Sequence, residues 1–88
     1  MSKDWNRVKF VEVVIEKLMR DLGISREVTI KHMASFVKKY IILDERGYVD
    51  EMSVNEPERF FTIVANIYAE KLNRGADPQD VHDEIANS

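Results

Sequence analysis

Glycine and proline are so sparse in this chain that they leave only long, uninterrupted segments. Glycine occurs only at positions 23, 47 and 75, and proline only at 57 and 78. Because these residue types most often interrupt regular structure, the 88 residues divide into four segments. Apolar residues within the segments recur every three or four positions, which is helical spacing. We therefore expect residues 1–88 to form one all-α domain of four helices.

The first segment is expected to be helical from about Lys3 to Leu22. Ser2 or Asp4 can cap its start, and Gly23 can end it in a left-handed conformation. Its apolar residues fall at alternating spacings of three and four, which places them on one face of a helix. These residues are Val8, Val11, Ile15, Leu18 and Leu22.

The second segment is expected to be helical from about Arg26 to Leu43, with Ser25 as its N-terminal cap. One face is apolar and suits a core. The opposite face is basic, and no acidic residue balances it between Glu27 and Asp44. The basic face carries Lys31, Ser35, Lys38 and Lys39, with His32 beside them.

A turn is expected at residues 44–47, where Gly47 is free to adopt a positive φ. The residues on either side, 41–43 and 48–49, are β-branched or aromatic and suit a short β-hairpin between the second and third helices. The alternative is that the second helix ends near Leu43 and a loop follows.

The third segment carries the clearest helix start, because Asn55 is a good cap and Pro57 suits the first turn. This helix should run to about Arg74, and its apolar residues nearly surround it, so we expect it to be central. The fourth helix should begin after Asp77. Val81 and Ile85 are its apolar stripe, and the carboxylates around His82 predict a solvated face.

Charge is divided between the two halves of the chain. Residues 1–39 hold nine Lys/Arg and five Asp/Glu, a balance of +4, whereas residues 40–88 hold four and eleven, a balance of −7. Such a split indicates that the two ends meet different partners or each other. The acidic run through Asp44, Glu45, Asp50, Glu51, Glu56 and Glu58 lacks the spacing of a calcium loop and favours a solvated loop.

Composition and motifs point away from catalysis. The chain has no cysteine, no glycine-rich phosphate loop, no His-rich metal motif and no nucleophile with a recognisable base. We therefore expect a protein that is not an enzyme and needs no metal or cofactor. No apolar run approaches the ~20 residues of a membrane span, and the N-terminus lacks a signal-peptide pattern. A soluble cytoplasmic protein that does not bind membranes is expected.

A second group of apolar residues lies off the main stripe of the first segment. Phe10 and Val13 share a side with Lys17 and Arg20, and Trp5 lies on a further side. An exposed aromatic and aliphatic surface with a basic rim is typical of a protein interface. The sequence therefore predicts a regulatory or protein–protein interaction module that binds a protein partner through Trp5, Phe10, Val13, Lys17 and Arg20, and it is compatible with a homodimer.

The alternative function is nucleic-acid binding through residues 19–40. Gly23 in a tight turn, Ile24 behind it and Ser25 opening a second helix resemble the local pattern of bacterial helix-turn-helix regulators. The chain departs from that pattern at Met19 and Thr29, where the regulators have a small residue and a buried aliphatic one. The resemblance implies a DNA-binding surface formed by Arg26, Thr29, Lys31, His32, Lys38 and Lys39. The acidic residues near Gly47 and the pI of about 5.3 count against it.

Overall fold

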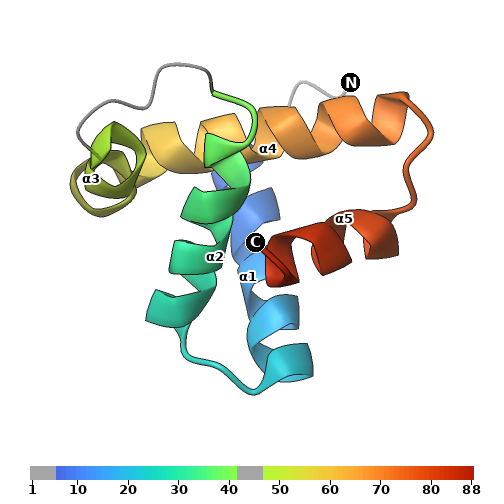
Figure 1. The fold of residues 1–88 in the computed structure, drawn as a ribbon, viewed down its shortest axis with the longest axis horizontal. Coiled ribbons are helices and arrows are strands. Elements are labelled where there is room, and N and C mark those ends of the chain that lie inside the picture. Colours follow the sequence, from blue (N-terminus) through green and yellow to red (C-terminus); the bar gives the residue numbers. More distant parts are fainter. Residues whose placement is uncertain (1–5, 42–46) are drawn as a thin grey trace.

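A computed structural model describes residues 6–41 and 47–88, and these ranges contain helices and no strands. Figure 1 shows α4 lying across one end of the α1 and α2 pair, with α3 and α5 on opposite sides of α2. The all-α prediction is confirmed, but the described residues form five helices rather than four. In chain order they are α1 (Arg7–Leu22), α2 (Arg26–Lys38), α3 (Tyr48–Asn55), α4 (Pro57–Asn73) and α5 (Pro78–Ala86).

The boundaries of α1 follow from local hydrogen bonds. The side chain of Asn6 accepts the backbone N–H of Lys9 at 3.1 Å and caps the helix. The caps expected from the sequence, Ser2 and Asp4, lie outside the described residues. Gly23 ends the helix as predicted, with φ +66° and its N–H donated to the carbonyl of Met19 at 2.9 Å.

The start of α2 is predicted correctly, and its end is not. Ser25 caps the helix by accepting the N–H of Val28 at 3.2 Å. The helix ends at Lys38 instead of Leu43, because Lys39 and Tyr40 donate their N–H groups to carbonyls only three residues back. This tighter turn directs the chain toward α4 and α5, where the Tyr40 hydroxyl finds its partners.

The β-hairpin predicted between the second and third helices is not formed. Tyr48 and Val49, its expected second strand, begin the helix α3. Val49 and Met52 are both buried, and their spacing of three residues places them on one face of that helix. Burial of this face in the core favours a helix over a strand, although Val49 is β-branched. Residues 42 and 43, of the expected first strand, lie outside the described residues.

The long helix α4 begins one residue later than predicted. Asn55, the expected cap, is instead the last residue of α3, and Glu56 joins the two helices without a side-chain capping bond. Pro57 occupies the first turn of α4, as predicted. As expected of a central helix, α4 contacts all four other helices, but it buries one face only, which carries Phe60, Phe61, Val64, Ala65 and Tyr68.

The last helix, α5, begins at the predicted cap, where Asp77 accepts the N–H of Gln79 at 3.1 Å. Val81 and Ile85 are fully buried, as expected from their spacing. The prediction of a solvated face around His82 is wrong for His82 itself, which is only 7% exposed. Its ring packs edge-on against Tyr68 of α4, with the ring centroids 5.6 Å apart.

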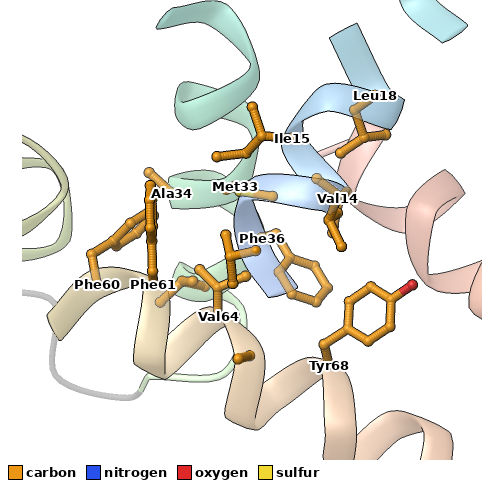
Figure 2. Packing of buried hydrophobic residues seen from close by; sticks show 14 of the residues in the cluster. Val14, Ile15, Leu18, Met33, Ala34, Phe36, Phe60, Phe61, Val64 and Tyr68 are labelled. Carbon is orange, nitrogen blue, oxygen red and sulfur yellow. The ribbon is translucent and has the colours of Figure 1, made fainter. Parts of the chain in front are cut away.

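The core lies where α1, α2 and α4 meet, and α3 and α5 close its two sides (Figure 2). Ile15, Met33, Phe36 and Phe60 are fully buried there, one or more from each of the three helices. Truncating a buried Phe to Ala costs about 3–5 kcal/mol, a large share of a small domain's stability. The core therefore holds α2 in place by its buried side. The opposite side, which carries the exposed residues Glu27, Val28 and Lys31, is called the outer side of α2.

Candidate functional site

The interaction surface expected on α1 is only partly exposed in the fold. Phe10 packs against the core and contacts Tyr68 edge-on, with the ring centroids 4.9 Å apart. Lys17 is paired with Asp21 at 2.8 Å, one helical turn away. Val13 is 65% exposed. Because Phe10 faces α4, Val13 is left without the aromatic neighbour that the sequence had suggested.

Two residues complete the expected α1 surface. Arg20 is exposed near the end of α1, where it lines an open hollow with Met19 and Ile24. Trp5 lies outside the described residues. The structure therefore brings Val13, Lys17 and Arg20 to the surface but does not join them to Phe10.

The basic residues of α2 mostly contact carboxylates of the same chain. Arg26 donates two hydrogen bonds to Glu12 of α1, at 2.6 and 2.9 Å. These bonds lower the pKa of Glu12 below its ordinary value, although partial burial opposes them. Lys38 lies 2.7 Å from Asp50 of α3, at the other end of the helix. Arg26 and Lys38 thus join neighbouring helices.

Two further residues that were expected to face nucleic acid are buried or contact the chain itself. Thr29 is fully buried, and its hydroxyl donates to the carbonyl of Ser25 at 2.9 Å. His32 is half-buried, with Nδ1 3.3 Å from the carbonyl oxygen of Ser88. Lys31 is exposed and has no ion-pair partner among residues 6–41 and 47–88. The expected recognition residues therefore do not form one continuous exposed surface.

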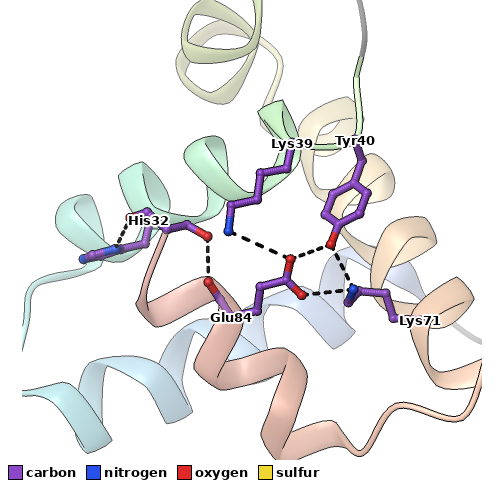
Figure 3. Close-up of polar contacts among 6 residues, drawn as sticks. His32, Lys39, Tyr40, Lys71 and Glu84 are labelled. Carbon is purple, nitrogen blue, oxygen red and sulfur yellow. Dashed lines mark hydrogen bonds and ion pairs between the residues drawn. The ribbon is translucent and has the colours of Figure 1, made fainter.

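The C-terminal end of α2 is tied to α4 and α5 through Glu84 (Figure 3). The Tyr40 hydroxyl donates to one carboxylate oxygen of Glu84, and Lys71 Nζ lies 3.0 Å from the other. Lys71 also donates to the Tyr40 hydroxyl at 2.9 Å, and Lys39 lies 3.9 Å from Glu84. These four residues are the Glu84 cluster, which holds three helices together.

The charges of the Glu84 cluster stabilise one another. Burial raises the pKa of Glu84, but hydrogen bonds from Tyr40 and Lys71 and the nearby ammonium charges outweigh it, so the pKa lies below the ordinary 4.5. Hydrogen bonds to Tyr40 and Glu84 raise the pKa of Lys71 above its ordinary 10.5. Both groups therefore stay charged near neutral pH, which suits a structural ion pair better than a proton-transfer site.

A groove of about 470 Å³ lies between α2 and α3, and we call it the α2/α3 groove. Ile30, Ala34 and Val54 supply its apolar surface. Ala34 is buried at 2% exposure, whereas Val54 is 76% exposed. Charged and hydroxyl side chains complete the lining: Glu27, Lys31 and Ser35 from α2, and Asp50 and Ser53 from α3.

The α2/α3 groove was not predicted from the sequence, since residues 48–55 were interpreted as a strand or loop. The spacing of Val49 and Met52 is the signal that would have identified α3. With a helix in place there, Val54 falls away from those two buried residues and becomes an exposed side chain beside α2.

A smaller hollow of about 150 Å³ lies on the other side of α2, next to the end of the chain. Val28, which is 39% exposed, lines it together with His32 and Ser88. Lys31 lines both this hollow and the α2/α3 groove, so it lies on the ridge between them. The outer side of α2 therefore has one hollow on each flank.

No protein-family model, curated protein or solved structure matches this chain. Within the described residues, none of the helices is both long enough and apolar enough to cross a membrane. The same residues contain no group of three or more His, Cys, Asp or Glu side chains placed to hold a metal ion.

Proposed function

We propose that this protein is a small protein–protein interaction module whose α2/α3 groove receives an apolar side chain from a partner. The observation that carries the proposal is Val54, which is 76% exposed at a groove floored by Ile30 and Ala34. Single exposed valines are ordinary, but an apolar hollow with a polar rim is the common form of an interface pocket.

The rim of the groove suits binding because some of its polar side chains are held by hydrogen bonds and others have no ion-pair partner among the described residues. Asp50 accepts a hydrogen bond from Lys38 at 2.7 Å, and its backbone carbonyl accepts one from the Ser53 hydroxyl, also at 2.7 Å. Glu27 and Lys31 have no ion-pair partner among the described residues. A partner segment with an apolar side chain between charges of opposite sign would complement this rim.

The α1 surface stays a prediction, and the geometry favours the groove over it. Val13 and Val54 are similarly exposed, but Val13 stands on a convex helix face among charged residues. Val54 adjoins a concave apolar surface. Because a hollow removes more apolar area from water around one inserted side chain, the groove can contribute more binding energy.

Nucleic-acid binding also stays a prediction. It is less well supported because Arg26 and Lys38 already contact carboxylates and Thr29 is buried. A polarisation titration with non-specific duplex DNA tests it, and we expect no binding at low salt. Binding that falls steeply as salt rises, and that K38E combined with K39E removes, would favour nucleic acid instead.

Val54→Asp and Val13→Asp form a matched pair for testing the groove. Each places a carboxylate at an exposed helical valine, so both variants should keep the wild-type melting temperature. In affinity purification with quantified partner proteins, we expect Val54→Asp to reduce retention by about tenfold or more. Val13→Asp should retain its partners. Loss with Val13→Asp alone would place the binding surface on α1.

A further inference from the structure

The outer side of α2 has three parallel parts. The α2/α3 groove with Val54 lies on the α3 side, and the hollow lined by Val28 lies on the other side, at Ser88 near the end of α5. Lys31 lines both hollows and lies on the ridge between them, and Glu27 lines the α2/α3 groove one helical turn before Lys31, on the same row of α2 side chains. Figure 1 shows α3 and the C-terminal end of the chain on opposite sides of α2, as this description requires.

Glu27 and Lys31 of one copy can pair with Lys31 and Glu27 of a second copy when the two α2 helices run in opposite directions. Glu27 and Lys31 are one helical turn apart and carry opposite charges. Neither has an ion-pair partner in the described part of the chain. If an identical helix is placed antiparallel, Glu27 of each copy faces Lys31 of the other, which forms two equivalent ion pairs.

We infer that the partner of this face is a second copy of the chain, packed through antiparallel α2 helices about a two-fold axis. The inference rests on the proposed function, because the α2/α3 groove is the contact surface in both. A two-fold axis is the usual symmetry of homodimers, and it requires one surface to be complementary to itself. The reversed order of Glu27 and Lys31 meets that requirement.

The same axis also brings the exposed valines together. When two identical helices pack face to face and antiparallel, the two-fold axis lies in the interface and is perpendicular to both helices, so each flank of α2 meets the same flank of the other copy. The α3 sides of the two copies therefore face each other and bring their Val54 side chains together, and the Val28 side chains meet on the opposite flank. Val54 is 76% and Val28 39% exposed in the single chain, so the dimer covers two apolar residues on each copy that the fold leaves open.

Charge reversal tests the ion pairs with purified protein. Sedimentation equilibrium at high micromolar concentration should show wild-type particles of twice the 10.3 kDa chain mass. E27K or K31E alone places like charges opposite each other and should weaken dimerisation by about tenfold or more. The double variant E27K/K31E recreates both pairs in swapped positions and should recover the wild-type dissociation constant to within about threefold.

Cysteine cross-linking tests the geometry, and the chain offers a clean background because it contains no cysteine. V54C protein should form a disulfide-linked dimer on mild oxidation, since the two copies of position 54 face each other across the interface. V13C protein is the matched control and should remain monomeric under denaturing, non-reducing conditions.

Three outcomes would overturn the inference. They are a wild-type particle of 10.3 kDa at high micromolar concentration, a double reversal that dimerises as poorly as the single ones, and equal cross-linking of the V54C and V13C proteins. If the purified protein is a monomer but Val54→Asp still removes another protein in affinity purification, the second-copy inference fails and the proposed function stands. If both experiments are negative, both proposals fail.

Discussion

The two ends of α2 use their charges in different ways. At the C-terminal end, Lys38 contacts Asp50 of α3 and Lys39 approaches Glu84 of α5. At the N-terminal end, Arg26 contacts Glu12 of α1, but Glu27 and Lys31 on the next turn contact no opposite charge in the described residues. The C-terminal charges therefore join helices, whereas Glu27 and Lys31 present their charges to the surface.

This difference explains part of the charge split seen in the sequence. The pairs made by Lys38 and Lys39 join the basic first half of the chain to its acidic second half. One of the two interpretations of the split, that the halves meet each other, thus holds for these residues. Charges that the fold does not pair, such as Glu27 and Lys31, are the better guide to a recognition surface.

Among the charged contacts, the largest expected effect on stability is at the C-terminal end of α2. Glu84→Gln removes the charge shared by Tyr40, Lys71 and Lys39, and we expect it to lower the free energy of unfolding by about 1–3 kcal/mol. Urea denaturation measures the change. Glu51→Gln, at an exposed position of α3, is the control and should change it by less than about 0.5 kcal/mol.

The effect of Glu84→Gln should also depend on pH. Because the folded pKa of Glu84 lies below the ordinary 4.5, its ionised form stabilises the fold above that pH and this stabilisation is lost as the pH falls. The stability difference between wild type and Glu84→Gln should therefore shrink in acid. A difference independent of pH would show that the carboxylate charge is not what holds the Glu84 cluster together.

A second pH effect is expected at the buried His82 of α5. Its Nδ1 has no hydrogen-bond partner within the described residues, and burial, aided by Lys17, lowers its pKa below the ordinary 6.5 although Asp21 and Asp83 oppose this shift. The neutral ring is therefore favoured in the folded state.

The contribution of neutral His82 to the free energy of unfolding should therefore be fully present above about pH 6.5. It should fall as the pH drops below this value, because the unfolded chain binds a proton at His82 before the folded chain does. Melting temperatures of wild type and His82→Gln, measured from neutral pH downward, test this expectation, and the variant should show a weaker decline. Equal slopes for His82→Gln and wild type would contradict the assignment.

A smaller effect is expected where α2 contacts α3. The pair between Lys38 and Asp50 joins side chains that are 35% and 58% exposed. Exposed ion pairs contribute about 0.2–1 kcal/mol, so Lys38→Met should lower stability by no more than that. Thermal denaturation measures this loss of stability. A loss as large as that caused by Glu84→Gln would contradict the expectation that the Glu84 cluster stabilises the fold more than this ion pair does.

The smallest effect on stability is expected at the other end of α2. Glu27→Gln and Lys31→Gln remove charges that the fold does not pair, so each should change the free energy of unfolding by less than about 0.5 kcal/mol. Both should weaken self-association in sedimentation equilibrium. A substantial loss of stability without a change in association would assign these charges to the fold and remove the contrast between the two ends.

Local chemistry made several helix boundaries predictable. Ser25 and Asp77 act as caps because a side-chain oxygen reaches an N–H two or three residues ahead, a property of the nearby sequence alone. Gly23 ends α1 through a backbone conformation that glycine adopts readily. Pro57 starts α4 for a similar reason, because its fixed φ suits the first turn.

Three features depend on tertiary contacts and could not be predicted from the local sequence. Val49 is β-branched, yet burial with Met52 in the core makes its segment helical. His82 has acidic neighbours, yet it lies on the side of α5 that carries Val81 and Ile85 and is buried with them. The α2/α3 groove depends on how two separate helices pack, so the sequence did not identify Val54 as part of a groove.

The most direct test of the central claim compares two positions on the protein in the cells that produce it. A photoreactive amino acid at position 54 or at position 13 can be activated by light, and the covalent adducts can be quantified by mass spectrometry. The account predicts a defined protein adduct at position 54, lost when E27K is added, and only background at position 13. A defined adduct at position 13 with background at position 54 would contradict it.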